Sequence, residues 1–251
     1  MDLNLKDRTF LVTAASRGLG YSVAKSLSDE GAEVRICGRN EESLKKAIET
    51  LGESAQYHIA DLSKKEDVSK LIRSIASETR HIDGLFVNAG GPPPGSFSIL
   101  SDDDWKKAIN LTLMSAVWLT RETLPLLKLS DSPSILYSTS ISVKQPIDNL
   151  LLSNAIRPAV IGMMRTLVGE LAPQSIRVNA ICPGYIYTER VKELMAASES
   201  GVETINARIP LGRMGKPEEF GPVCAFLLSP VASYIHGALL LVDGGLYQGM
   251  M

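Results

Sequence analysis

The chain has 251 residues, of which 45% are apolar and 22% are charged. Lys and Arg total 26 and Asp and Glu total 28, giving a formal net charge of -2. That balance argues against a protein built to wrap nucleic acid or to bind an anionic membrane surface. No apolar run is long enough to span a bilayer, and the N-terminus has no apolar core of signal-peptide length.

The three cysteines cannot all pair, and their positions do not have the spacing of metal ligands. They are Cys37, Cys182 and Cys224. A reducing compartment suits such a chain, so the sequence predicts a cytoplasmic protein with no metal, no membrane and no nucleic-acid partner.

Short apolar runs of strand length alternate with longer segments of helical spacing. The runs lie at Thr9–Ala14, Glu33–Cys37, Ala55–Ala60, Ile82–Val87, Ser134–Thr139, Ile176–Ile181 and Ala238–Val242. Several are apolar at consecutive positions, as in strands covered on both faces. Strands that alternate with helices call for a parallel sheet with right-handed crossovers. Seven strands favour an open, doubly wound (Rossmann-type) α/β sheet over a barrel, which needs eight strand–helix units.

The helical segments carry start and stop signals. Leu19, Val23 and Leu27 fall on one stripe, and Gly31 suits the end of that helix. Ser101, followed by three aspartates, predicts a capped helix start. No segment has the composition of a linker, so we expect one domain over residues 1–251.

The first strand leads through a glycine-containing turn into the first helix. The turn is Thr13-Ala14-Ala15-Ser16-Arg17-Gly18-Leu19-Gly20. Glycines at this place let backbone N–H groups approach a pyrophosphate at the positive end of the helix. The placement after the first strand is the informative feature, and the alternative is that Gly18 and Gly20 serve only a tight turn.

With the motifs that follow it, this turn resembles the short-chain dehydrogenase/reductase family, in which it is written TGxxxGxG. Ala14 replaces the first glycine of that pattern. The other motifs are Asp61-Leu62, Asn88-Ala89-Gly90, Pro183-Gly184 with Thr188, and Asp243-Gly244-Gly245. The resemblance covers nearly the whole chain and is greatest to the 3-oxoacyl-[acyl carrier protein] reductase-like branch.

The resemblance implies an oxidoreductase that binds a dinucleotide cofactor. The cofactor-binding residues that it implies are Thr13, Ser16, Arg17, Gly18, Leu19, Gly20, Arg39, Asp61, Leu62, Asn88, Ala89, Gly90, Arg157, Pro183, Gly184, Ile186 and Thr188.

Charge at the end of the second strand indicates which cofactor is used. A carboxylate there would bind a ribose 2′-OH, but the sequence Cys37-Gly38-Arg39-Asn40 has none. Arg39 and Arg17 can both reach a 2′-phosphate, which guanidinium groups bind in a bidentate way. The sequence therefore favours NADP(H), the alternative being two solvated surface arginines.

In the resembled family, a Tyr-xxx-Lys pair on the helix after the fifth strand performs the acid/base chemistry. The resemblance places Asn110 and Ser140 at the family's Asn and Ser, but it places Ser153 at the tyrosine and Arg157 at the lysine. No tyrosine lies between positions 137 and 185, and no lysine between 144 and 192, so a shifted alignment cannot restore the pair. A serine is a far weaker acid than a phenol, and arginine does not exchange protons near neutrality.

The proton must then come from elsewhere. Tyr185 after the sixth strand is one candidate, and a water held by Ser140, Ser153 and Asn110 is another. Tyr137 has the opposite strand parity to Ser140, so we expect it to point to the other face of the sheet.

Three functions stay open at this point. The first is an NADP(H)-dependent oxidoreductase acting on a carbonyl/alcohol pair of a small-molecule or acyl substrate, with an atypical proton relay. The second is a catalytically weak or inactive NADP(H)-binding sensor or partner subunit. The third is reduction of an activated C=C bond, whose protonation needs less help.

Further predictions concern the substrate lid, the mouth of the site, the subunit contacts and Pro158. Residues 189–213 resemble the family's substrate lid, and the proline-rich stretch 91–95 is expected at the mouth of the site. The run Ala238–Val242 resembles the family's subunit-contact region and implies a homo-oligomer, a tetramer or a dimer; a buried edge strand would explain it without a partner. Pro158 predicts either a helix that begins near Arg157 or a kink at Asn154.

Overall fold

The computed structural model describes residues 1–196 and 201–250. Its centre is a seven-stranded sheet in the order β3-β2-β1-β4-β5-β6-β7, with every neighbouring pair parallel. The strands are β1 (Thr9–Val12), β2 (Glu33–Gly38), β3 (Gln56–Ile59), β4 (Gly84–Val87), β5 (Ser134–Ser138), β6 (Arg177–Pro183) and β7 (Leu239–Val242). The strand order reverses between β1 and β4, where such sheets open a ligand crevice at the carboxyl ends of their strands.

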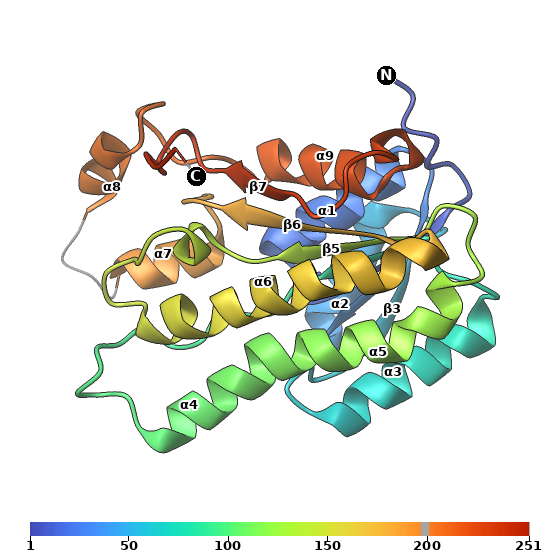
Figure 1. Cartoon of the computed structure of the whole chain (residues 1–251), viewed down its shortest axis with the longest axis horizontal. Coiled ribbons are helices and arrows are strands. Elements are labelled where there is room, and N and C mark those ends of the chain that lie inside the picture. Colours follow the sequence, from blue (N-terminus) through green and yellow to red (C-terminus); the bar gives the residue numbers. More distant parts are fainter. Residues whose placement is uncertain (197–200, 251) are drawn as a thin grey trace.

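Helices cover both faces of this sheet (Figure 1). They are α1 (Gly18–Asp29), α2 (Glu41–Leu51), α3 (Lys65–Glu78), α4 (Asp102–Ile109), α5 (Ser115–Leu127), α6 (Leu151–Leu171), α7 (Glu189–Ala196), α8 (Val202–Arg208) and α9 (Pro217–Leu228). α1, α2 and α9 pack on one face, and α3, α5 and α6 pack on the other. None of these helices is both long and apolar enough to cross a membrane.

Each face has its own hydrophobic core. On β1, Phe10 and Val12 point into the core beneath α1 and α9, while Leu11 between them points into the core beneath α3, α5 and α6. All three side chains are fully buried. Because both faces are covered, each strand must be apolar at consecutive positions, which is the pattern that the sequence shows.

The predicted fold class is confirmed, and each predicted strand is found with its ends shifted by no more than two residues. The first strand stops at Val12 because Ala14 already turns, with φ at 48°. The predicted helix start is also confirmed: Ser101 and Asp104 form a reciprocal capping box at α4.

One predicted helix start is wrong. α6 begins at Leu151 and runs through Pro158, so no helix begins near Arg157. Pro158 is exposed, and its ring therefore does not disturb the core, although it leaves the carbonyl four residues earlier without a helical donor. The alternative, a kink at Asn154, stays a prediction.

Candidate active site

A cavity of about 470 Å³ opens at the carboxyl ends of the central strands. It brings together most of the residues that the sequence singled out. Those that line it are Ser16, Arg17, Gly18, Leu19, Arg39, Asp61, Leu62, Asn88, Ala89, Gly90, Ser140, Ser153, Arg157, Pro183, Gly184, Tyr185, Ile186 and Thr188. Thr13, Gly20 and Asn110 are not among the lining residues.

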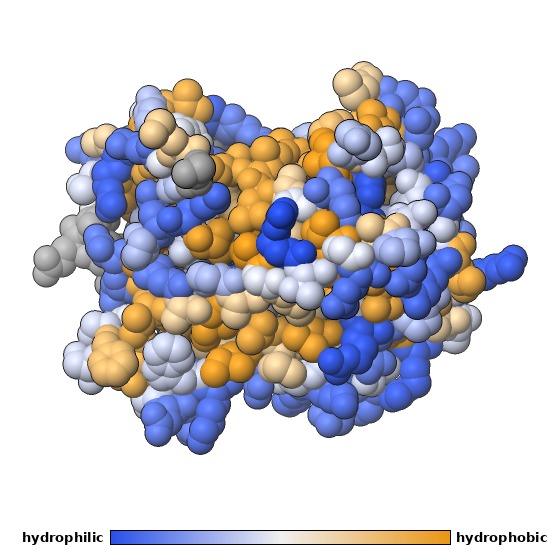
Figure 2. Space-filling view, viewed as in Figure 1, coloured by the Kyte–Doolittle hydropathy of each residue, from blue (hydrophilic) through white to orange (hydrophobic). Residues whose placement is uncertain are grey.

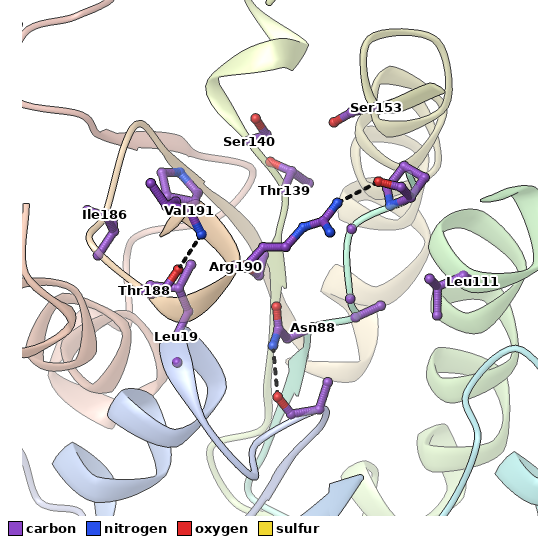
Figure 3. Close-up of a pocket in the computed structure, with 18 of the residues that line it drawn as sticks. Leu19, Asn88, Leu111, Thr139, Ser140, Ser153, Ile186, Thr188, Arg190 and Val191 are labelled. Atoms are coloured by element: carbon purple, nitrogen blue, oxygen red, sulfur yellow. Dashed lines mark hydrogen bonds between the residues drawn. The ribbon is translucent and has the colours of Figure 1, made fainter. Parts of the chain in front are cut away.

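Thr13 and Gly20 shape the cavity from beneath. The Thr13 hydroxyl lies 2.7 Å from the Asn88 carbonyl oxygen and accepts a hydrogen bond of 2.8 Å from the Asn88 backbone N–H. The Asn88 side-chain amide donates to the carbonyl oxygens of Thr13 and Ala14, each at 3.3 Å. Figure 3 shows one of these hydrogen bonds as the dashed line from Asn88. The end of β4 is thereby fixed to the turn that follows β1.

The turn itself has little room for side chains. A Cβ atom on Gly20 would lie 2.5 Å from the Ala14 carbonyl oxygen and 2.9 Å from the Ala15 Cα. Gly18 has φ of 64°, and a Cβ there would lie 3.8 Å from a Thr188 methyl carbon. Ala14 has a left-handed φ of 48°, a conformation that favours glycine. The backbone at position 14 therefore has a conformation that glycine would adopt without strain.

Positive charge gathers at the end of the cavity beside β2. The Arg17 side chain is 69% exposed and lies 3.7 Å from Glu193, and Arg39 is also exposed. Burial raises the pKa of Asp61, but hydrogen bonds from Ser63 and the charge of Arg39 outweigh it, so that the pKa lies below its ordinary value. Asp61 is therefore a carboxylate at neutral pH, and both guanidinium groups remain accessible to an anion.

At the other end of the cavity, α6 presents Ser153 and Arg157. The Arg157 Nε donates to the Ser153 hydroxyl at 3.1 Å, and its Nη1 donates to the carbonyl oxygens of Thr139 at 2.8 Å and Ser138 at 3.3 Å. The Ser153 hydroxyl also lies 3.2 Å from the Ser142 hydroxyl. Burial lowers the pKa of Arg157 to about 10. Ser153 and Arg157 are thus connected directly through a hydrogen bond.

Ser140 stands at the same end of the cavity as Ser153 (Figure 3). Its hydroxyl oxygen accepts from the Ser142 backbone N–H at 3.0 Å, which leaves the hydroxyl hydrogen available to a ligand. Ser142 therefore contacts both predicted serines, and the sequence analysis did not single it out. The alternation of serines at positions 138, 140 and 142 was the signal that could have found it.

The structure does not bring Asn110 to the cavity. Residues Asn110–Met114 form one π-helical turn between α4 and α5, and Asn110 is exposed on it. Thr112 on the same turn is buried, and its hydroxyl has no hydrogen-bond partner. It lines a small second cavity together with Ser138 and Arg157.

The structure separates Tyr137 from Tyr185, as the strand parity of Tyr137 predicts. Tyr137 points away from the cavity into the core beneath α5, where its hydroxyl lies 2.7 Å from that of Thr120 and burial raises its pKa. Tyr185 is half-buried and lines the cavity. Tyr187 is exposed, with the Lys192 ammonium 5.0 Å from its ring centre.

The predicted lid corresponds to α7 and α8, although residues 197–200 lie outside the described residues. Arg190 on α7 reaches across the cavity and donates to the Pro92 carbonyl oxygen at 2.7 Å (Figure 3). The proline-rich stretch therefore does stand at the mouth of the site. Arg190 lines the cavity, a role that the mixed charges of its segment did not predict.

Nothing in the described residues suggests a metal centre, since no three His, Cys, Asp or Glu side chains are grouped there as ligands would be. A doubly wound sheet with a glycine turn at its first crossover and a crevice at its switch point defines a nucleotide-binding protein. Comparison with known proteins gives the family.

The family model described as enoyl-(acyl carrier protein) reductase matches residues 13–247. The chain is similar to the 3-oxoacyl-[acyl-carrier-protein] reductase FabG of Chlamydia trachomatis, with 32% identity over 96% of this chain and 98% of that protein. Among solved structures, it is similar to L-sorbose reductase from Gluconobacter frateurii complexed with NADPH and L-sorbose. That match has 27% identity, full coverage of both chains and a TM-score of 0.93.

A third match is Pseudomonas aeruginosa RhlG in complex with NADP, with 27% identity over 98% of each chain and a TM-score of 0.91. The chain belongs to the short-chain dehydrogenase/reductase family. It is related over almost its whole length to oxidoreductases of that family.

Proposed function

We propose that the chain is an NADP(H)-dependent oxidoreductase acting on a carbonyl/alcohol pair of a small-molecule or acyl substrate, with an atypical relay at Ser153 and Arg157. The observation that carries this proposal is the continuity of one cavity from Arg39, beside the glycine turn, to Ser140, Ser153 and Arg157. Binding groups for a dinucleotide and hydroxyl groups for a carbonyl oxygen thus face the same space.

The donor set fits NADP(H). Backbone N–H groups at the start of α1 suit the pyrophosphate, and Arg17 and Arg39 suit the 2′-phosphate. In the family pattern, Asp61 and Leu62 meet the adenine, Arg157 meets the ribose, and the segment from Pro183 to Thr188 meets the nicotinamide. The bound cofactor would supply or accept a hydride. Solved relatives hold NADPH or NADP, which supports the choice.

The side chains at the far end of the cavity would hold the reacting oxygen. Ser140 and Ser153 offer hydroxyl groups, and Arg157 offers a charge that stays positive at neutral pH. Tyr185, or a water held by the two serines, would supply the proton in place of the missing tyrosine.

Two measurements test this function. Calorimetry should detect binding of NADPH and NADP⁺, and NADPH should be oxidised in the presence of some member of a panel of ketones. No heat with either nucleotide would contradict the proposed cofactor, and binding without any turnover would contradict the proposed activity.

A second candidate function is a catalytically weak NADP(H)-binding sensor or partner subunit. One observation favours it: α6, which carries the acid/base pair in the family, has neither a tyrosine nor a lysine. Brisk turnover by the purified protein alone would exclude this candidate.

We also propose a cytoplasmic homo-oligomer, a tetramer or a dimer, that folds as one domain. The three cysteines are free and buried, as suits a reducing compartment. Leu240 on β7, the last strand of the sheet, is 38% exposed, and apolar side chains gather over β7 and along α5 (Figure 2). Light scattering on the wild type and on Leu240→Asp tests the oligomer, because a charge there should weaken a contact at this edge.

A further inference from the structure

The walls of the cavity carry an excess of positive charge. Among the described residues, three carboxylates line it against four arginines, which are Arg17, Arg39, Arg157 and Arg190. One of the carboxylates is paired from outside the cavity, because the Lys192 ammonium lies 2.6 Å from Glu189 and Lys192 is not a lining residue. The cavity therefore favours ligands that carry negative charge.

The other two carboxylates lie with the arginines of the cofactor end. Asp61 interacts with the charge of Arg39, and Glu193 lies 3.7 Å from Arg17. Glu193 also lies 4.0 Å from Arg190, which is too far for a hydrogen bond. Arg190 therefore shares one distant counterion with Arg17.

Arg190 is held by backbone, with most of its hydrogen-bond donors left unused. Its Nη2 donates to the Pro92 carbonyl oxygen at 2.7 Å, and a Cβ on Gly91 would lie 3.3 Å from the same nitrogen. The guanidinium group thus lies along the backbone of residue 91, where there is no side chain. Among the described residues, the Pro92 carbonyl is its one hydrogen-bond acceptor, so the other N–H groups are available to a ligand in the cavity.

A second uncompensated charge faces the same cavity from α6. Arg157 donates to a serine hydroxyl and to two backbone carbonyl oxygens, and it forms no ion pair with any Asp or Glu among the described residues. Burial lowers its pKa most, to about 10, and the charge of Arg190 lowers it further. Two cations that act on one another across one space are both stabilised by an anion between them.

The wall between β5 and α6 is apolar. Ile141, Ile147 and Leu150 line the cavity from this segment, and Val191 lines it from α7. These side chains suit a hydrocarbon group, whereas the edge of one guanidinium group matches the two oxygens of a carboxylate. The cavity therefore suits a ligand with an apolar body and one carboxylate.

We propose that the substrate is an oxo acid whose carboxylate is bound by Arg190, while Ser140 and Ser153 bind its carbonyl oxygen. Arg157 adds to the positive potential at that carboxylate. The proposal rests on the proposed function: the carbonyl carbon still gains a hydride from NADPH, the oxygen gains a proton, and the product is a hydroxy acid. It adds the chemical class of the substrate and makes Arg190 a specificity-determining residue.

A binding measurement tests the carboxylate site without turnover. Calorimetry on the NADP⁺-loaded protein compares 3-phenylpropanoate with 3-phenylpropanamide, which has nearly the same shape and no charge. The loaded form is used so that the cofactor phosphates occupy Arg17 and Arg39. We expect the acid to bind at least about tenfold more tightly, because hydrogen bonds between charged groups are stronger than those between neutral groups. Equal affinity, or tighter binding of the amide, would overturn the proposal.

Arg190→Gln should lose most of that preference, because glutamine keeps a donor for the Pro92 carbonyl and removes the charge. Arg190→Lys should keep part of it. Lys192→Met is the matched control, since it removes a positive charge from the same helix at a residue that does not line the cavity. The nicotinamide charge of NADP⁺ is present in every variant, so differences between the variants report on Arg190. An unchanged preference in Arg190→Gln, or an equal loss in Lys192→Met, would overturn the assignment.

Two other roles for Arg190 predict different results. If Arg190 only ties α7 to Pro92, its loss would weaken the acid and the amide alike and leave their ratio unchanged. If it binds the cofactor phosphates instead, Arg190→Gln would weaken NADP⁺ binding and again leave the ratio unchanged. Either result would overturn the proposal and leave the proposed function standing.

Turnover of matched acids and esters separates this proposal from the proposed function. Phenylpyruvate, benzoylacetate and levulinate differ in the number of carbons between the carboxylate and the carbonyl group, and each is compared with its methyl ester. We expect at least one acid to have a kcat/KM at least about tenfold above that of its ester, with the difference in KM. Esters that react as well as their acids in every pair would overturn the oxo-acid proposal alone. No turnover of any acid, ester or ketone would contradict the proposed function, and the binding comparison would then decide the carboxylate site.

Discussion

The two ends of the cavity differ in whether backbone atoms or side chains are available to a ligand. At the end beside α1, the binding groups are largely backbone atoms of a tight turn, and the geometry is kept even where Ala14 must adopt a left-handed φ of 48°. At the end beside α6, the groups to which we assign the chemistry are the side chains of Ser153 and Arg157, on a helix that has neither a tyrosine nor a lysine. A binding site made from backbone depends on the fold itself, whereas chemistry made from side chains can change while the fold stays the same.

Ser153 and Arg157 have a defined geometry at this end of the cavity. Arg157 spans from Ser153 on its own helix to the carbonyl oxygens at the end of β5. The sharpest tests therefore ask whether the chemistry can be changed while the cofactor end of the cavity is left alone.

The largest effect is expected from Ser153→Tyr combined with Arg157→Lys. A phenol activated by a neighbouring ammonium would supply the missing general acid, and such catalysis contributes roughly a hundredfold or more. We expect carbonyl reduction to rise by about that factor. Steady-state rates with the ketone panel check this, and calorimetry gives the NADPH affinity alongside, because Arg157 is also proposed to meet the cofactor ribose. No gain in a folded double variant would show that the pocket around these positions has diverged as well.

At the cofactor end, Gly20→Ala should be the most damaging single change. The new Cβ would lie 2.5 Å from the Ala14 carbonyl oxygen, so the turn must move. Overpacking of this kind lowers the free energy of unfolding by about 1–3 kcal/mol, and a turn that has moved should also bind NADPH more weakly. Calorimetry measures the affinity.

Gly162→Ala is the matched control for that change. Gly162 lies on α6, and a Cβ there meets nothing within 4 Å. Its NADPH affinity should equal that of the wild type. Equal losses in the two variants would mean that the tight contact at Gly20 does not control the site.

A smaller effect is expected from Arg39→Asp. A carboxylate at this position repels a 2′-phosphate and attracts a ribose 2′-OH, so NADPH binding should weaken by about tenfold relative to NADH binding. Titrations with both cofactors give the ratio. Arg73→Asp is the control, since Arg73 is exposed but does not line the cavity. An equal loss for NADPH and NADH would remove the phosphate role of Arg39.

Sequence patterns predicted the fold well because they depend on burial. Consecutive apolar residues such as Phe10, Leu11 and Val12 occur where both faces of a strand are covered, and that requirement holds along the whole sheet. The residues around the cavity were found for a related reason, because motifs that follow a parallel strand meet at one edge of the sheet.

Features that depend on local departures from regular geometry were not predictable in the same way. Residues Asn110–Met114 form a π-helical turn, which interrupts the regular spacing that helical patterns assume, and on it Asn110 is exposed and Thr112 is buried. α6 continues through Pro158, so the predicted helix start near Arg157 is wrong. Arg190 donates to the Pro92 carbonyl oxygen across the cavity. The two residues are far apart in the sequence, so no sequence pattern predicts this contact.

The smallest effect, and the most direct test of the contrast between the two ends, is expected from Ala14→Gly. A left-handed conformation costs a non-glycine residue about 1–2 kcal/mol, and glycine removes that strain. Glycine also gains freedom in the unfolded chain, which offsets about 0.4–1 kcal/mol, so the net gain in unfolding free energy should be about 0.5 kcal/mol. Such a change raises the melting temperature by roughly 1–2 °C in a chain of this length.

Ser175→Gly is the matched control, because Ser175 is exposed, has φ of 58° and does not line the cavity. Both variants should gain stability, while only Ala14→Gly can also change NADPH affinity; a loss of stability in Ala14→Gly alone would show that the alanine methyl contributes more through packing than its backbone strain costs.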